Sequence, residues 1–391
     1  MSKRRSNGEG SIVKNIRNGE QIGWRASITI GRNDEGKLIR KQFTGRTQAD
    51  VRNKLDNFKK QMLMGVLNDN KITVSTWFYT WLFDYRKQDL KPKSFQRYHG
   101  IYTKYIENTD LGNIKLNDLK TTHLQRYYKK LLDEKVTPST IEQINTKLKT
   151  CLGDAERQGY IQKNWCKLVT LPKKTNIKEV RVLTKEEQER FLKAINGHEL
   201  ELLYTLTLGT GLRIGEVLGL KWSDIDFNNS ELHVNRSLQR TPIYENNKIV
   251  RYEIQETTPK TKNSFRTVPI PTNITKSLFN YKKEQDIHIS LVEDEYNNKN
   301  YVFCDKLGKP IDDKKPGRNL KSVLSSINIE PIKFHALRHT YATRLFELDI
   351  PPKTVQHLMG HADIETTMNI YTKVMPEQKL KAAERINDIF L

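Results

Sequence analysis

The sequence of 391 residues has few cysteines, fewer acidic than basic residues, and no long apolar run. A helix that crosses a membrane needs about 18 consecutive apolar residues, and no run approaches that length. Residues 1–5 are mostly polar and basic and lead into a polar stretch, whereas a secretory signal peptide would continue with an apolar core. We therefore expect a cytoplasmic protein of bacterial type that has no membrane segment.

The cysteines are widely spaced and odd in number: Cys151, Cys166 and Cys304. This distribution argues against a disulfide framework and against a zinc site built from cysteines. It fits a reducing compartment, in agreement with the absence of a signal peptide.

Positive charge is abundant. The chain holds 67 Lys and Arg against 46 Asp and Glu, which gives a formal net charge of +21. So large an excess repels itself unless a polyanion neutralises it, so nucleic acid is the first candidate partner and an acidic membrane surface the second. The length predicts two to three domains.

Residues 1–66 form the first of three predicted parts, and residues 1–60 contain 15 Lys and Arg against 6 Asp and Glu. Three short runs of alternating apolar and polar residues are separated by turn-forming sequences at 18–19 and 34–36, and an amphipathic stretch follows at 47–64. We predict a three-stranded sheet backed by one helix. Four basic residues are expected on or near its open face, where a merely solvated basic surface is the alternative: Arg25, Arg32, Arg40 and Lys41.

Residues 72–172 show the apolar spacing of helices throughout, and Thr137-Pro138-Ser139 is typical of a helix start. Basic side chains on these helices, by themselves, indicate no more than a solvated face; they include Lys91, Lys93 and Arg97. A polar, basic linker leads to the third part, residues 178–391. The whole is predicted as an α+β multidomain protein with a small sheet, an all-α domain and a mixed α/β domain.

Two segments of the third part place charged residues at breaks in regular structure. In Leu208–Glu216, two glycines interrupt a Leu-rich helix just before Arg213, and Glu216 follows one turn later on the same face. Thr258–Pro269 has the pattern of two strands and the turn between them, and the turn carries lysines. Each feature alone is ordinary, since most such side chains are solvated or form surface ion pairs.

Two further segments follow toward the C-terminus. His335 and Arg338 are three residues apart on one predicted helix face. Gly360 is expected to end another predicted helix before His361, and Tyr371 follows ten residues after the histidine. Taken singly, these residues would be assigned to a helix surface or to the core.

In this order and spacing, the four segments resemble the tyrosine recombinase, or phage-type integrase, family. Its signature is an arginine in Thr-Gly-Leu-Arg-x-x-Glu, a hairpin lysine, His-x-x-Arg, a Gly-His pair, and a tyrosine about ten residues later. The resemblance covers the whole chain. It implies an arm-type DNA-binding domain at 1–66, a helical core-DNA-binding domain at 72–172, and a tyrosine recombinase catalytic domain at 178–391.

The resemblance implies a site-specific recombinase that integrates, and also excises, a mobile element without a metal or other cofactor. Tyr371 would attack a DNA phosphodiester and form a covalent 3′-phosphotyrosyl intermediate. The guanidinium groups of Arg213 and Arg338 can each donate two hydrogen bonds to phosphate oxygens and neutralise the charge that develops there. By family analogy, His335 would assist removal of the tyrosine proton, and His361 would bind or position the phosphate.

Two roles remain to be assigned. Glu216 would orient Arg213 and not act on DNA. The family gives its hairpin lysine the role of protonating the 5′ oxygen that leaves, and this turn contains both Lys260 and Lys262. We favour Lys260, because a Lys-Thr pair, a polar turn and then Arg-x-x-Pro is the form associated with this subgroup. Lys262 stays open as the alternative.

Three other functions compete with recombination. A metal enzyme is conceivable because His335/His339 and His357/His361 are spaced four residues apart, although neither pair has the glutamate of the His-Glu-x-x-His motif. A non-enzymatic DNA-binding regulator would have similar charge, and a type IB topoisomerase would use the same tyrosine chemistry. The complete set of motif residues argues against the regulator, and the two predicted DNA-binding domains argue against the topoisomerase.

The partners implied by the resemblance are double-stranded DNA attachment sites and a tetramer assembled on them. A host DNA-bending protein and an excision factor are possible additional partners. Residues 376–391 have the pattern of an amphipathic helix, which by family analogy would dock on a neighbouring protomer.

Overall fold

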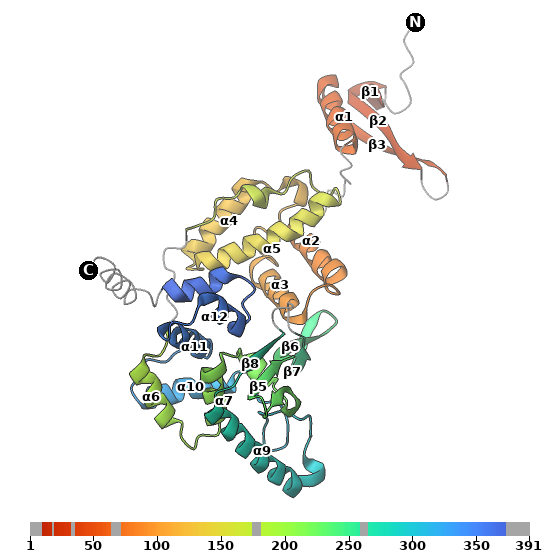
Figure 1. Cartoon of the computed structure of the whole chain (residues 1–391). Helices are drawn as coiled ribbons and strands as arrows, with labels where there is room; N and C mark the ends of the chain where they lie inside the picture. The colour runs from red at the N-terminus through yellow and green to blue at the C-terminus, as the bar shows by residue number, and fades with distance from the viewer. Residues whose placement is uncertain are drawn as a thin grey trace, which may run out of the picture. The chain divides into compact units, whose positions relative to one another are not determined.

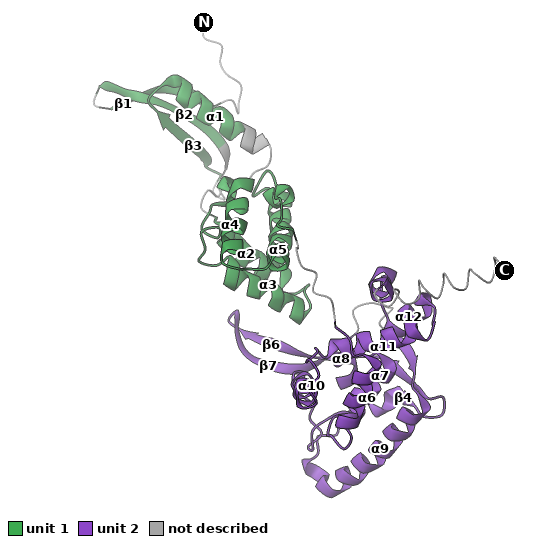
Figure 2. Cartoon of the chain, turned by 90° about the vertical axis from the view of Figure 1, so that its left-hand side faces the viewer, with its two compact units in different colours: residues 1–176 green, residues 177–391 purple. Residues whose placement is uncertain are grey.

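The computed structural model describes residues 10–17, 19–32, 36–63, 72–173, 181–258 and 265–372. The chain divides into two compact units, residues 1–176 and residues 177–391 (Figure 2). The first unit holds an N-terminal sheet and a helical region, and the second holds a mixed region with the predicted motif segments (Figure 1). The predicted helix at 376–391 lies outside the described residues.

The N-terminal sheet is antiparallel and consists of β1 (Ser11–Arg17), β2 (Glu20–Arg32) and β3 (Leu38–Gly45), in the order β1-β2-β3. Helix α1 (Gln48–Leu63) packs on one face of it (Figure 1). The buried residues between them are Ala26, Ile28, Val51, Leu55 and Phe58. The predicted three-stranded sheet backed by one helix is confirmed.

The basic residues predicted for the open face of this sheet do not all lie there. Side chains alternate along a strand, so Arg25 and Arg40 lie on the face that α1 leaves open. Lys41 is out of phase with them: it pairs with the buried Ile28, and its ammonium lies 5.9 Å from the centre of an aromatic ring of α1. The prediction for Lys41 was therefore wrong about the face. The backbone of Arg32 ends β2, and its side chain lies outside the described part of the chain.

The helical region of the first unit contains α2 (Val74–Thr80), the π-helical η1 (Trp81–Arg86), α3 (Pro92–Tyr105), α4 (Thr121–Asp133) and α5 (Pro138–Arg157), with short 3-10 turns η2 (Leu116–Asp118) and η3 (Trp165–Leu168). Trp77 and Trp81 are buried, and their indole N–H groups donate to oxygens of α5. Helix α5 begins as predicted, with Thr137 as its cap. The basic residues expected to bind DNA lie at the start of α3: Lys91, Lys93 and Arg97.

The second unit mixes helices with small sheets. Its helices are α6 (Lys185–Ala194), α7 (Glu201–Thr210), α8 (Ile214–Leu218), α9 (Thr272–Val292), α10 (Lys315–Ser326), α11 (His335–Glu347) and α12 (Pro352–Met359), with 3-10 turns η4 (Trp222–Asp224) and η6 (Glu293–Glu295). Strands β4 (Ile225–Asp226), β5 (Glu231–Val234) and β8 (Arg266–Pro269) form one sheet, and β6 (Ser237–Glu245) pairs with β7 (Lys248–Thr257) in a separate hairpin. The predicted mixed α/β composition is confirmed.

The strands around the predicted lysine turn pair differently from the prediction. The sequence predicts two strands joined by a turn, but β7 pairs with β6 whereas β8 pairs with β5. The two strands therefore belong to different sheets and do not pair with each other. The reason is burial: Val268 of β8 is 0% exposed and lies in the main core of this unit, where it meets Leu232 of β5. In the part of the chain that the structure describes, no helix is long and apolar enough to cross a membrane.

Candidate active site

Three arginines from distant parts of the sequence meet at the C-terminal end of α12. The last carbonyl groups of a helix lack partners within it and carry partial negative charge, so they attract cationic donors. Here the carbonyl oxygens of residues 358–360 accept hydrogen bonds in turn from Arg266 Nε at 2.9 Å, from Arg338 Nη2, and from Arg213 Nη2 at 3.2 Å. One helix end thereby fixes guanidinium groups from β8, from α11 and from the cap of α8.

Two glycines in the left-handed conformation allow this arrangement. Gly211 ends α7 with a φ of 65°, and its carbonyl accepts a hydrogen bond from Nη1 of Arg338 at 2.5 Å. Gly360 ends α12 with a φ of 61°, and a Cβ at that position would lie 2.9 Å from Cδ of Arg266. Other residues rarely adopt such a φ, so a side chain at either position would be strained. The helix breaks predicted at these two motifs are confirmed, and each places a carbonyl beside an arginine.

Glu216 supplies the carboxylate of this arginine cluster. It accepts hydrogen bonds from the backbone N–H and Nη1 of Arg213 at 2.9 and 2.7 Å. It also accepts from Nη2 and Nη1 of Arg266 at 2.9 and 3.2 Å. Burial alone would raise the pKa of Glu216, but the hydrogen bonds and charges of the two arginines lower it to about 2. Glu216 therefore lies where the predicted orientation of Arg213 requires it, and it is ionised at neutral pH.

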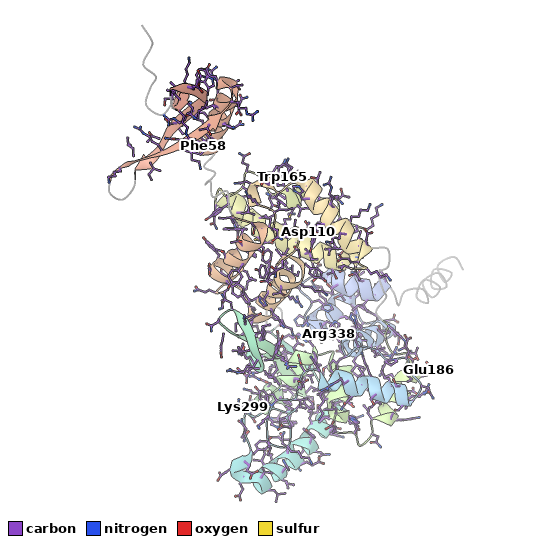
Figure 3. The ribbon with its side chains drawn as sticks, turned by 180° about the vertical axis from the view of Figure 1, so that it is seen from behind. Phe58, Asp110, Trp165, Glu186, Lys299 and Arg338 are labelled. Atoms are coloured by element: carbon purple, nitrogen blue, oxygen red, sulfur yellow. The ribbon has the colours of Figure 1, made fainter. Side chains whose placement is uncertain are left out.

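Arg338, labelled in Figure 3, is a buried cation that forms no ion pair within the described residues. Its side chain is 1% exposed, and its buried Nε has no hydrogen-bond partner among the residues that the structure describes. Burial and then the charge of Arg213 lower the pKa of Arg338 to about 9. Three guanidinium groups and one carboxylate leave this cluster with a net charge of +2. Because an unpaired buried charge costs several kcal/mol, an anion bound here would stabilise the cluster.

Two histidines border the arginine cluster, His335 at the start of α11 and His361 directly after α12. His335 is exposed at the surface, yet desolvation of its ring, followed by the charges of His339 and Arg338, lowers its pKa to about 4. Burial and the charges of Arg338 and Arg213 lower the pKa of His361 to about 3. Both imidazoles are therefore neutral at pH 7, so each can accept a proton on one ring nitrogen and donate from the other.

Similarity to known proteins assigns this arrangement to a family. Residues 181–378 match the phage integrase family, and residues 73–132 match the phage integrase N-terminal SAM-like domain. A tyrosine recombinase XerC-like protein of Caldanaerobacter subterraneus subsp. tengcongensis is 39% identical over 390 residues, which cover 96% of this chain and 98% of that protein. The chain belongs to the phage integrase family of tyrosine recombinases. It is a DNA strand-transferring enzyme of site-specific recombination.

Solved structures share the fold of this recombinase. The Tn1549 transposon integrase in complex with a circular intermediate DNA matches with a TM-score of 0.66 at 23% identity, over 81% of this chain and 99% of that chain. A lambda integrase tetramer bound to a Holliday junction matches with a TM-score of 0.54 at 18% identity, over 94% of this chain and 96% of that chain. The predicted fold class of a tyrosine recombinase is confirmed.

Tyr371, the predicted nucleophile of the recombinase, lies in a helical segment at 364–372. Its ring packs against Phe346 of α11, with 5.0 Å between the ring centroids, in a hydrophobic cluster with Ile370 and Met359. Phe346 follows Arg338 by eight residues, which is about 12 Å along a helix axis. The structure thus gathers the predicted arginines and histidines at one half of α11 and packs the tyrosine ring against its other half.

The two lysines that the sequence leaves open as alternatives, Lys260 and Lys262, lie outside the described residues. The strand that follows them is nevertheless tied to the site. Arg266, the first residue of β8, bonds both to Glu216 and to the end of α12.

Two contributors to the site are absent from the sequence-based prediction. Arg266 is visible in the sequence only as the start of an Arg-x-x-Pro pattern, and its carboxylate partner, Glu216, lies 50 residues away. Thr367 is 0% exposed, and its Oγ1 lies 2.9 Å from Nδ1 of His361. In the sequence, Thr367 could have been noticed as a polar residue one helical turn before Tyr371, on a helix face that is otherwise apolar.

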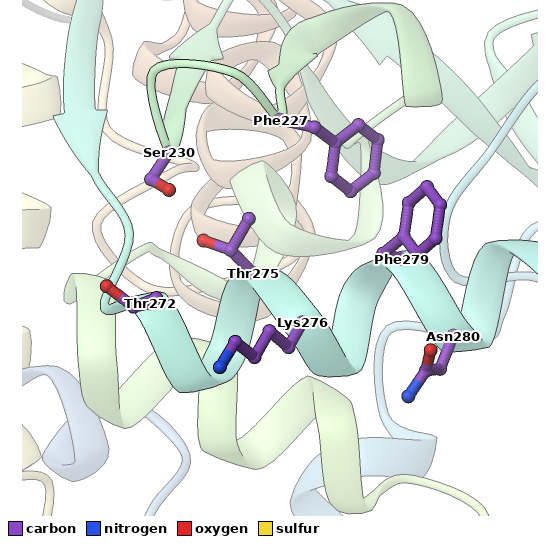
Figure 4. A pocket seen from close by; sticks show the side chains of 7 residues that line it. All are labelled: Phe227, Ser230, Thr272, Thr275, Lys276, Phe279 and Asn280. Carbon is purple, nitrogen blue, oxygen red and sulfur yellow. The ribbon is translucent and has the colours of Figure 1, made fainter.

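A separate hollow of about 500 Å³ lies between α9 and the turn before β5 (Figure 4). It is lined by Phe227, Ser230, Thr272, Thr275, Lys276, Phe279 and Asn280. None of these belongs to the predicted site. Among the described residues, no group of three or more His, Cys, Asp or Glu side chains could hold a metal ion.

Proposed function

We propose that this recombinase integrates and excises a mobile element by cutting and rejoining DNA at defined attachment sites. The hydroxyl oxygen of Tyr371 bonds to phosphorus as the bond from phosphorus to the 5′ oxygen breaks, so the enzyme becomes linked to the 3′ phosphate. The 5′ hydroxyl of the partner strand then attacks this phosphotyrosine, restores the DNA backbone and releases the tyrosine. The ester keeps the energy of the original bond, so rejoining needs no external energy source.

The observation that carries this proposal is the net positive arginine cluster, in which the buried Arg338 forms no ion pair with any described residue. A phosphodiester under attack accumulates negative charge on its non-bridging oxygens, and preorganised donors each contribute roughly 2.7–4 kcal/mol at such a centre. Arg213 is 36% exposed, so one guanidinium of the cluster is accessible to DNA. Glu216 holds two of the arginines without cancelling the excess charge.

Two protons must move during cleavage. One leaves the phenol oxygen of Tyr371, and one reaches the departing 5′ oxygen of the DNA. The phenol of Tyr371 must lose its proton as its oxygen attacks phosphorus. His335 is neutral and accepts that proton; a bound phosphate adds negative charge beside it and thereby raises its low pKa. His361 donates a hydrogen bond to a phosphate oxygen. Lys260, with Lys262 as the alternative, protonates the departing 5′ oxygen.

We assign a separate role to each of three domains: an arm-type DNA-binding domain at 1–66, a core-DNA-binding domain at 72–172 and the catalytic domain at 178–391. The family match at 73–132 and the unit boundary after residue 176 support this division. Arg25, Arg40 and the basic start of α3 contact DNA phosphates, and each neutralised phosphate adds about 0.9 to the slope of log affinity against log salt.

Recombination joins two duplexes, so four protomers assemble on DNA, as the lambda integrase tetramer does on a Holliday junction. The Tn1549 neighbour, which was solved with a circular intermediate DNA, supports a mobile element as the substrate. We propose a host DNA-bending protein and an excision factor as additional partners that influence the choice between integration and excision.

Incubation with nicked candidate attachment-site DNA tests this function. The fragment after the nick diffuses away, so the covalent adduct accumulates and can be seen on a denaturing gel. We expect an adduct with the natural protein in the presence of EDTA, and none with Tyr371→Phe, which should still bind DNA. Tyr341→Phe is the matched control, because Tyr341 is only 9% exposed and packs in the core.

Three outcomes contradict the proposal. An adduct formed by Tyr371→Phe would move the nucleophile to another residue. Inhibition by EDTA would favour a metal-dependent nuclease. Relaxation of a supercoiled plasmid, without strand exchange between two attachment sites, would make the protein a topoisomerase.

A further inference from the structure

Thr367 is a buried polar residue that the chemistry proposed above does not use. Its side chain is 0% exposed, and Oγ1 lies 2.9 Å from Nδ1 of His361. The backbone of His361 is held separately by Gln356: the N–H donates to the Gln356 carbonyl at 3.2 Å, and Nε2 of Gln356 donates to the His361 carbonyl at 3.1 Å. The histidine is thus fixed at its main chain by one residue and at its ring by another.

The direction of the hydrogen bond between Thr367 and His361 decides which ring nitrogen carries the proton. The neutral ring has one N–H, so its two nitrogens have opposite roles. Helical threonines often donate to the carbonyl four residues earlier, as Thr372 does to Met368 at 3.1 Å. Thr367 makes no such bond within the described residues, so its hydroxyl proton is available for Nδ1 of His361.

The other ring nitrogen of His361 then carries the hydrogen. Arg338 and Arg213 donate to the carbonyls of Met359 and Gly360, directly before His361, so the imidazole lies next to the proposed phosphate position. An unprotonated Nε2 would direct a lone pair at an anion, whereas a protonated Nε2 donates to it. The charge of the phosphate and the hydroxyl of Thr367 therefore favour the same tautomer.

Thr367 also belongs to the helical segment that carries the nucleophile. It precedes Tyr371 by four residues, which is about one helical turn, so the two side chains share a face of that segment. The hydrogen bond to His361 therefore joins this segment to the residue that follows the end of α12. The same helix end holds the three arginines.

We propose that Thr367 is a positioning residue of this recombinase. Its hydroxyl donates to Nδ1 of His361, holds the tautomer in which Nε2 donates to the phosphate, and ties the segment of Tyr371 to the arginine cluster. This inference rests on the proposed function, because it takes the bound phosphate and the nucleophilic tyrosine from it.

A set of matched variants tests the role of the hydroxyl. Thr367→Val removes it with little change of shape, Thr367→Ser keeps it, and Thr366→Val makes the same change at the exposed neighbouring threonine. On nicked attachment-site DNA we expect Thr367→Val to slow single-turnover adduct formation about tenfold, the scale of one lost hydrogen bond, with DNA affinity unchanged. Thr367→Ser and Thr366→Val should stay within about twofold of the natural protein.

A double variant separates action through His361 from a general packing role. If Thr367 acts through the imidazole, Thr367→Val should slow cleavage no further in a protein that already carries His361→Ala. Independent, multiplied effects of the two substitutions would overturn the proposal. So would equal adduct rates for Thr367→Val and Thr366→Val.

The tautomer can be measured without cleavage. In protein labelled with ¹⁵N-histidine, long-range proton–nitrogen spectra distinguish the two tautomers, and His361→Asn identifies the signal of His361 among the nine histidines. We expect the hydrogen on Nε2; a hydrogen on Nδ1 would overturn the inference, even if Thr367→Val did not fold. If the natural protein formed no adduct at all, the proposed function would fail, whereas the tautomer would still report on the hydrogen bond.

Discussion

Replacing Arg266 by glutamine should destabilise the second unit of the recombinase by about 3 kcal/mol. The Arg266 side chain is 2% exposed, and its two terminal nitrogens bond to Glu216 at 2.9 and 3.2 Å. Its Nε donates to the end of α12. Glutamine has neither the charge nor the forked shape to replace these bonds, so it would leave Glu216 buried with Arg213 as its remaining cation.

The magnitude follows from two independent considerations. Removal of one partner from a buried ion pair costs about 3–5 kcal/mol. The pKa of Glu216 gives a similar figure, since its fall from 4.5 to about 2 corresponds to roughly 3 kcal/mol, shared between Arg266 and Arg213. Because the folded-state pKa is depressed, this stabilisation is fully present above about pH 4.5 and is lost as the pH falls toward 2. Arg266→Gln should therefore also weaken the dependence of the free energy of unfolding on pH in this acid range.

Calorimetry at pH 7 measures the predicted loss. For a unit of roughly 200 residues, 3 kcal/mol lowers Tm by roughly 6–12 °C. Hydrogen exchange in peptides from α8 and β8 assigns the change to the second unit, since Glu216 lies in α8 and Arg266 begins β8.

The control makes the same substitution at an exposed ion pair. Arg251 is 59% exposed and bonds to Glu253 at 2.8 Å on the hairpin of β6 and β7. Arg251→Gln should cost less than about 1 kcal/mol, because water screens surface pairs. Equal Tm values for the two variants would refute the reasoning. So would an Arg266→Gln protein whose stability falls between about pH 4.5 and 2 as steeply as that of the natural protein.

Three further predictions concern recombination. Arg213→Ala and Arg338→Ala should each slow strand cleavage at least about 100-fold, because each removes a charged donor from the developing phosphate charge; near-normal single-turnover cleavage would exclude that arginine. Lys260→Ala should slow cleavage far more than Lys262→Ala, and a substrate with a 5′-bridging sulfur should rescue it; the reverse ranking would assign the acid to Lys262. Deletion of residues 1–66 should leave cleavage of core sites intact and impair integration, so a truncated protein that integrates normally would contradict the arm-binding role.

Local sequence signals predicted the helix ends well. Gly211 and Gly360 end their helices in the left-handed conformation, and α5 begins at Pro138 with its threonine cap. Such signals act within about one turn of the chain, so a single sequence contains all the residues involved. The face of Lys41 was mispredicted because successive side chains of a strand lie on opposite faces, so Lys41 cannot share the open face with its neighbour Arg40.

The order and spacing of the motif residues determined by themselves the family and the set of candidate side chains. Only the tertiary structure decided how these side chains are held. The carbonyls at the end of α12 bond to Arg338, Arg266 and Arg213 across 21, 92 and 147 residues of sequence. The separate pairing of β7 and β8 likewise depends on burial of Val268 in the common core. Hydrogen bonds to an unpaired helix end and burial of apolar surface depend on distances in space, which no local pattern of residues specifies.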